Sequence, residues 1–228
     1  MALRKLLLIS SLLIVGNCFG QSPMFKLISK KVSAEQDTIS FVSHVSAAGA
    51  STATTSSINS TGVNLIVIGI TSYNTFPTVS DSYSNTWTQL SSSTASSLAK
   101  CRLFYCINPT VGSGHTFSFS SSNTYSTINV LAFSNATGYV SENTANGNSP
   151  LGPSVTPTNN NSLVVSSLAY DNNGTSTVSG SFTKYDVLRS AGVNIYGGIA
   201  YYIQPTAASI ACTWTFTSPG ATSVAVFY

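Results

Sequence analysis

Charged side chains are scarce in this sequence, and their scarcity limits the partners that it can bind. Only 7% of the 228 residues are Lys, Arg, Asp or Glu, and the formal net charge is +3. We therefore expect neither a nucleic acid nor an anionic membrane as a partner. The low charge does not indicate disorder, because 43% of the residues are hydrophobic and the chain has eleven Tyr and eleven Phe. Such a chain can bury a core, and Ser, Thr and Asn must supply its solubility.

Cysteine and histidine are also few, which argues against the usual metal sites. The chain has two His and no Cys-x-x-Cys motif, so we predict no metal and no cofactor. Cys101 and Cys106 lie five residues apart on one predicted strand, which separates them by about 16 Å and prevents a disulfide between them. Cys212 can pair with either one, or all three thiols can be buried and unpaired. The sequence leaves both alternatives open.

The longest apolar run stands at the start of the sequence. Leu6 to Val15 follow the basic residues Arg4 and Lys5 and precede Gly20. This pattern predicts a secretory signal peptide over residues 1–20, cleaved before Gln21, because the run is short for a membrane span. A retained anchor and a lipoprotein acylated at Cys18 are the alternatives. We expect a secreted or cell-surface protein that has no membrane contact after cleavage.

Helical periodicity of useful length is absent after residue 20, whereas strand patterns are frequent. Residues 64–70 form a short apolar run rich in β-branched side chains, which suits a strand covered on both faces, and residues 162–170 repeat the pattern. Alternation over residues 213–217 predicts that Trp214 and Phe216 face the core while the three Thr face solvent. We predict an all-β protein, with residues 21–228 forming one antiparallel β-sandwich of two sheets, about ten to twelve strands and jelly-roll-like connectivity.

Two stretches, about residues 58–134 and 154–228, carry similar segments in the same order. Leu163-Val164-Val165 follows Leu65-Ile66-Val67 by 98 residues, and residues 201–206 follow residues 105–110 by 96. Two further pairs of segments have offsets of 97 and 94 residues. All strands share some composition, but the common order favours an internal duplication. We expect the two halves to combine into the two stacked sheets.

Three segments fall outside the predicted strands of the repeat. Residues 47–57 contain no large side chain and are predicted to be a flexible loop, and residues 135–153 are predicted to be the longest loop. Residues 24–32 alternate weakly and contain three Lys, as an edge strand would. If this strand pairs with a neighbouring subunit, the protein self-assembles; pairing within its own subunit, which we favour, leaves a monomer.

The segment at residues 79–88 reads V-S-D-S-Y-S-N-T-W-T, and further characteristic segments lie at residues 62–67, 103–109 and 114–117. In these segments the chain resembles uncharacterised secreted and phage-encoded β-sandwich proteins with a V-S-D-S-x-G-N-T-W-T-like turn motif. Ser84 stands where those proteins usually have Gly. The resemblance implies a β-sandwich in an extracellular or virion setting, and it implies no particular reaction.

Catalytic motifs are absent from the sequence. The acids are Glu35, Asp37, Asp81, Glu142, Asp171 and Asp186. No motif places two of them across a cleft, as glycoside hydrolysis requires. No Ser or Cys nucleophile motif is present for either His to activate. We predict instead that the Asp81 carboxylate caps backbone N–H groups in a turn. The protein is therefore predicted not to be an enzyme.

Aromatic residues beside polar turns give the better functional signal. The two equivalent apolar strands end at Tyr-Asn and Tyr-Asp-Asn, and an exposed ring beside such polar groups suits sugars. Packing of these rings in the core or its rim is the alternative. The predicted ligand-binding residues are Tyr73, Asn74, Tyr83, Trp87, Tyr170, Asp171 and Asn172.

The leading hypothesis is a secreted, non-enzymatic module that binds glycans or mediates adhesion. One alternative is a structural subunit of a virion or extracellular appendage that assembles through its sheet edges. A glycan-active hydrolase is the third alternative.

Overall fold

The apolar run that begins at Leu65 forms strand β4 (Leu65–Tyr73), and both of its faces are buried, as predicted. The structure is a computed structural model that describes residues 38–121, 125–171 and 175–228. Ile66, Ile68 and Ile70 pack into one hydrophobic cluster, whereas Leu65 and Val67 pack into another. Because a strand alternates its side chains between two faces, β4 is covered by a different layer on each side.

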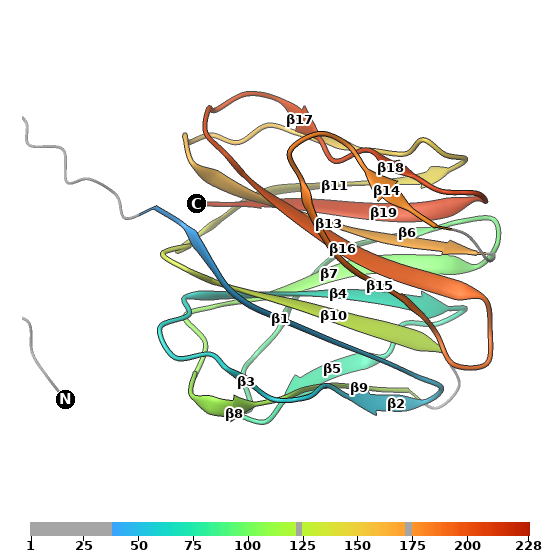
Figure 1. Cartoon of the computed structure of the whole chain (residues 1–228), viewed down its shortest axis with the longest axis horizontal. Coiled ribbons are helices and arrows are strands. Elements are labelled where there is room, and N and C mark those ends of the chain that lie inside the picture. Colours follow the sequence, from blue (N-terminus) through green and yellow to red (C-terminus); the bar gives the residue numbers. More distant parts are fainter. Residues whose placement is uncertain (1–37, 122–124, 172–174) are drawn as a thin grey trace, which may run out of the picture. The chain divides into compact units, whose positions relative to one another are not determined.

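The first half of the chain builds a five-stranded antiparallel sheet around β4 (Figure 1). Its edges are the first strand of the half and the strand that follows Trp87. In spatial order the strands are β1 (Ser40–Gly49), β10 (Ser126–Ser134), β4, β7 (Ala99–Ile107) and β6 (Thr88–Thr94).

The second half builds another five-stranded sheet with the same order of equivalent strands. Its central strand β13 contains Leu163-Val164-Val165, the predicted counterpart of Leu65-Ile66-Val67 in β4. In spatial order the strands are β11 (Tyr139–Gly147), β19 (Gly220–Phe227), β13 (Ser162–Asp171), β16 (Ile195–Gln204) and β15 (Thr183–Arg189). The shared order confirms two similar halves.

Short strands add an outer layer to each half, at the bottom and the top of the view in Figure 1. The chain of each half passes repeatedly between its main sheet and this layer, which is jelly-roll-like connectivity within each half. In the first half the layer consists of β2 (Thr52–Thr54), β9 (Phe117–Ser120) and β5 (Thr78–Asp81), together with the pair β3 (Ile58–Asn59) and β8 (Ser113–His115). In the second half it consists of the pairs β12 (Ser154–Val155) with β17 (Ile210–Ala211) and β14 (Thr177–Val178) with β18 (Trp214–Thr215).

The two main sheets pack face to face, and two groups of aromatic rings join them. Tyr201 of the second half stacks on Phe41 at 5.3 Å and meets Phe133 edge-on at 5.1 Å. In the equivalent positions, Tyr105 of the first half stacks on Tyr139 at 5.4 Å and meets Phe227 edge-on at 5.4 Å. Each half therefore inserts one ring against two rings of the other, and the arrangement repeats with approximate twofold symmetry.

A band of buried polar groups lies between the same sheets. Asn129 donates a hydrogen bond to the carbonyl of Gly197 (3.5 Å), and Ser223 donates one to the carbonyl of Cys101 (3.4 Å). A Cβ atom on Gly69 would lie 2.8 Å from the hydroxyl oxygen of its counterpart Ser167, so only glycine lets the central strands approach this closely. The Asn129 and Ser223 side chains hydrogen-bond across the interface, whereas the buried hydroxyl groups of Ser72, Ser126 and Thr127 have no hydrogen-bond partner among the described residues.

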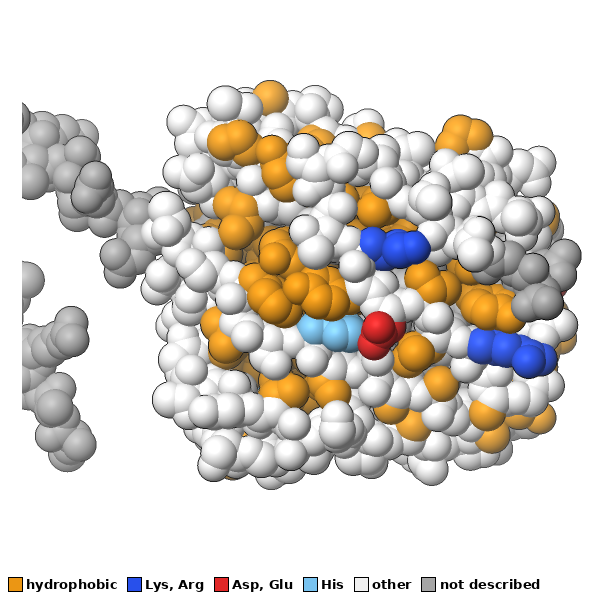
Figure 2. Space-filling model, in the orientation of Figure 1, with side chains coloured by type: hydrophobic (Ala, Val, Ile, Leu, Met, Phe, Trp, Pro, Cys, Tyr) orange, Lys and Arg blue, Asp and Glu red, His pale blue; other side chains and the backbone are white. Residues whose placement is uncertain are grey.

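All four edge strands of the main sheets contain a shift in register, at Phe41/Ser43, Gln89/Ser92, Tyr139/Ser141 and Tyr185/Val187. Such bulges twist an edge and discourage pairing with other chains. Side chains also tie facing edges together: Ser46 of β1 donates to Asp186 of β15 (2.6 Å), and Ser91 of β6 donates to Glu142 of β11 (2.8 Å). Figure 2 shows the face over β1 and β15, where hydrophobic side chains gather beside a histidine and an acidic side chain.

Two expectations for individual segments are wrong. Residues 47–57 contain the end of β1 and all of β2, because main-chain pairing with β10 and β9 needs no large side chains. Residues 135–153 contain β11, an edge strand whose polar side chains conceal it in the sequence. The repeat therefore includes β1 and β11, and residues 24–32 lie outside the described residues.

Cys101, Cys106 and Cys212 are all buried and unpaired, so none of the disulfides considered above is present. Burial raises the pKa of the Cys101 thiol to about 11 and that of Cys212 to about 12. In the described ranges, no helix is long and apolar enough to cross a membrane.

The packing predicts that the Trp214 side chain contributes strongly to the stability of the second half. Its side chain is fully buried, as predicted from the alternation, and its indole N–H donates to Ser166 (3.0 Å). Phe216 is buried, and Thr215 and Thr217 are exposed, while Thr213 is half-buried. Trp214→Ala should lower the free energy of unfolding by about 3–5 kcal/mol because it leaves a cavity. Urea unfolding should show almost no effect of the control Thr215→Ala, and a loss below about 1 kcal/mol for Trp214→Ala would reject the assignment.

Candidate functional site

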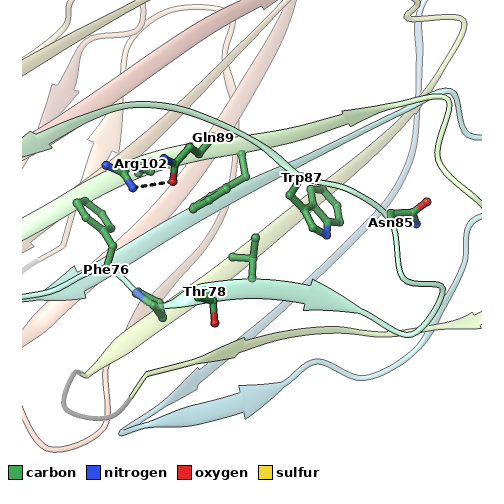
Figure 3. A pocket seen from close by; sticks show the side chains of 9 residues that line it. Phe76, Thr78, Asn85, Trp87, Gln89 and Arg102 are labelled. Carbon is green, nitrogen blue, oxygen red and sulfur yellow. Dashed lines mark hydrogen bonds between the residues drawn. The ribbon is translucent and has the colours of Figure 1, made fainter.

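The outer layer of the first half leaves a hollow of about 410 Å³ between β5 and strands β6 and β7 (Figure 3). Aromatic and polar side chains alternate around it, and its lining contains no carboxylate, His or Cys. The lining residues are Phe76, Pro77, Thr78, Val79, Asn85, Trp87, Gln89, Arg102 and Phe104.

One end of the hollow is formed by Arg102 on β7. Its guanidinium group lies 4.3 Å from the centre of the Phe76 ring and donates a hydrogen bond to the Gln89 side chain (3.1 Å), as Figure 3 shows. Burial lowers the pKa of Arg102, and the nearby Glu142 carboxylate opposes this effect. Arginine stays protonated at neutral pH, so a partly desolvated, oriented cation lines the hollow.

The other end is formed by Trp87 and Asn85. The Trp87 indole N–H donates to Asp81 Oδ2 (3.0 Å), and the ring meets Phe117 edge-on at 6.2 Å. Asn85 exchanges two hydrogen bonds with the backbone of Thr110, at 2.6 and 3.1 Å. Both side chains are therefore held in fixed orientations before any ligand arrives.

Asp81 organises the turn that carries these residues, and the prediction that it caps backbone N–H groups is confirmed. Its Oδ1 accepts hydrogen bonds from the backbone N–H of Tyr83 (2.7 Å) and of Asn85 (3.3 Å). Ser84 adopts a φ of 57°, a left-handed conformation that favours glycine. This is the position at which the V-S-D-S-x-G-N-T-W-T-like turn motif has Gly. The Asp81 carboxylate thus joins the turn backbone to the Trp87 ring.

His115 lies beneath this turn and is fully buried. Its Nε2 is 3.4 Å from Asp81 Oδ1 without the geometry of a hydrogen bond, and its Nδ1 is hydrogen-bonded to Ser60 (2.9 Å). Burial lowers the pKa of His115, although Asp81 acts in the opposite direction. The lowered pKa favours the neutral imidazole, and His115 supports the turn rather than facing the hollow, whose lining does not include it.

The second half lacks this arrangement at the equivalent positions. Arg102 pairs with Ile70 of β4 in the first half. Leu168 of β13 is the counterpart of Ile70 and pairs with Gly198, so Gly198 occupies the position equivalent to Arg102. The backbone N–H of Ser82 donates to the carbonyl of Thr116, and the equivalent hydrogen bond of the second half runs from Ser179 to Thr213. Val178 therefore occupies the position equivalent to Asp81, and Cys212 occupies the position equivalent to His115. A Cβ atom on Gly198 would lie 3.3 Å from Val187 and 3.5 Å from the Trp214 ring. Uncharged residues therefore take the positions of Arg102, Asp81 and His115 in the second half.

The structure brings only part of the predicted site together. Trp87 lines the hollow, and Tyr83 packs edge-on against His115 while its hydroxyl donates to the carbonyl of Ser113 (2.7 Å). Tyr73 packs at the interface between the main sheets, and Asn74 is an exposed residue with a φ of 71°. Neither lines the hollow.

The residues predicted at the end of β13 do not form an exposed aromatic tip. Tyr170 is fully buried and stacks on Tyr196, so its ring belongs to the core of the second half. Asp171 is half-buried, and Asn172 lies outside the described residues.

Sequence reasoning missed four lining residues on which the site depends: Phe76, Asn85, Gln89 and Arg102. Arg102 and Lys100 are the two charged residues of a largely apolar strand, and a partly buried charge there must find a partner or a ligand. Among the described residues, no group of three His, Cys, Asp or Glu could hold a metal ion.

Comparisons of the chain with protein-family models, with curated proteins and with solved structures find no match. The resemblance carried by residues 79–88 therefore stays a prediction, and the functional argument depends on the geometry of the hollow.

The bonds of Asp81 predict that Asp81→Asn destabilises the turn. The substitution places an amide N–H₂ or a neutral oxygen against the Trp87 indole N–H and weakens a charge-assisted hydrogen bond. We expect a loss of about 1.5–3 kcal/mol in urea unfolding and a shifted Trp87 indole N–H signal in the NMR spectrum. Asp186→Asn, at an exposed carboxylate that accepts a hydrogen bond from the Ser46 hydroxyl, is the control and should cost less stability. Unchanged stability together with an unchanged indole signal would contradict the role given to Asp81.

Proposed function

We propose that the protein is a secreted, non-enzymatic module that binds glycans and so mediates attachment to a glycan-bearing surface. The observation that carries the proposal is the hollow of the first half, in which Phe76 and Trp87 stand beside Gln89, Asn85 and Arg102. Sugar rings stack their C–H faces on aromatic side chains, while their hydroxyl groups form hydrogen bonds with amides and cations.

Preorganisation supports this proposal. Trp87 is fixed by Asp81 and Phe117, and Arg102 is fixed by Phe76 and Gln89. Side chains that are already ordered lose little conformational entropy when a ligand binds. Polar support of this kind is absent from the equivalent site of the second half, where Val178 and Gly198 take the places of Asp81 and Arg102. A duplicated fold that keeps an aromatic and polar hollow in one half is consistent with a function in that half.

The two alternatives have less support. Assembly of a virion or appendage through sheet edges must overcome the register shifts of all four main edge strands. A glycan-active hydrolase requires two carboxylates that face the substrate, and none lines the hollow.

The proposal predicts that Trp87 contributes a stacking surface. The secreted protein should bind at least one class of oligosaccharide on a glycan array, and Trp87→Ala should weaken that binding about 10-fold or more, as measured by calorimetry. Trp87→Phe should retain part of the affinity because it keeps a ring.

Tyr185→Ala is the matched control, since Tyr185 is a half-buried aromatic residue of the second half that stacks on Phe41. Absence of binding to every glycan would refute the proposal. Binding that is lost in Tyr185→Ala and kept in Trp87→Ala would place the site elsewhere.

A further inference from the structure

Arg102 is the only charged residue that lines the hollow, and its charge has little compensation. Among the described residues, no carboxylate forms an ion pair with it. Glu142, whose charge acts on Arg102, has its two oxygens engaged by the backbone N–H and the hydroxyl of Ser91, at 2.9 and 2.8 Å. The guanidinium group therefore lacks the direct anionic partner that a partly buried cation requires.

The hydrogen bonds of Arg102 are also incomplete. Nη1 donates to Gln89, and Nε is buried without a hydrogen-bond partner among the described residues. Phe76 covers one face of the guanidinium plane, which leaves recognition to the N–H groups at the edge of that plane. An arginine edge fits a carboxylate well, because two parallel N–H···O bonds can form.

We propose that the hollow is specific for acidic glycans, and that Arg102 binds the carboxylate of a hexuronate residue whose ring stacks on Trp87 or Phe76. This inference depends on the proposed function, since it names the class of sugar that the same site takes. The second half supports the assignment: Gly198 replaces Arg102 there, and Val187 and Trp214 fill the space. The position of Arg102 in the first half is thus occupied by a residue without a charge or a side chain in the second half.

The test compares oligosaccharides that differ only in the carboxylate. The secreted protein is titrated calorimetrically with oligogalacturonate, oligoglucuronate and oligomannuronate, and with the carboxyl-reduced form of each. We expect at least one uronate to bind about 10- to 100-fold more tightly than its reduced form, as for hydrogen bonds between charged groups. Arg102→Gln should abolish this preference, and Arg102→Lys should retain only part of it because lysine cannot form the bidentate pair.

Arg189→Gln is the matched control. It removes one positive charge from an exposed arginine of β15, so it should leave the preference unchanged. Urea unfolding of each variant checks that the fold is retained, and the comparison of acidic and reduced sugars with the unaltered protein tests the inference even if an Arg102 variant does not fold.

The outcomes separate this inference from the proposed function. Equal affinity for acidic and reduced sugars would overturn the inference and leave glycan binding intact. A preference that survives in Arg102→Gln, or stronger binding of sulfated neutral sugars than of any uronate, would also overturn it. Failure to bind any sugar, acidic or neutral, would overturn both.

Discussion

The contact between the two central strands, β4 and β13, determines how the rest of the protein is arranged. Each strand carries apolar side chains on both faces, so neither can lie at a surface. One face of each meets the other half, and the opposite face meets the small outer layer of its own half. Gly69 and Ser167 allow close approach at the centre of this contact, and the reciprocal aromatic groups around Tyr105 and Tyr201 lie to either side. Removing either half would leave a large apolar sheet face exposed to water.

This dependence leaves the outer layers free to diverge. The face of each main sheet that meets the other half is constrained by packing across the interface, whereas each outer layer packs only within its own half. In the second half, Trp214, Val178 and Cys212 fill the outer core with apolar groups. In the first half, Asp81 occupies the position equivalent to Val178 and His115 the position equivalent to Cys212, and the two polar side chains support the turn from beneath. The hollow lies beside Trp87, which this turn holds in place, and the proposed glycan site belongs to the half that has the polar turn.

Much of this arrangement follows from patterns within single strands. The apolar runs in β4 and β13 predicted both central strands, their offset predicted the repeat, and alternation placed Trp214 and Phe216 in the core. Strand β11 was not predicted, because an edge strand is held by main-chain hydrogen bonds and its polar side chains leave no period. The Asp81 turn was predicted from local chemistry. The contacts of Arg102 with Phe76 and Gln89 were not predicted, because they join three segments that are brought together only by the register of the strands. The burial of Tyr170 was not predicted for the same reason, since it depends on packing against Phe216 and Tyr196.

The central claim is that the outer layer of the first half binds the ligand while its counterpart in the second half only packs. Amide chemical shifts, recorded while the isotope-labelled protein is titrated with its tightest-binding oligosaccharide, test this claim most directly. The account predicts changes at residues 76–79, 85–89 and 102–104, including the indole N–H of Trp87, and none at Val178, Phe182 or Gly198. Changes centred on the second-half positions, or on Phe41, Tyr185 and Tyr201 at the β1 and β15 edge, would contradict it.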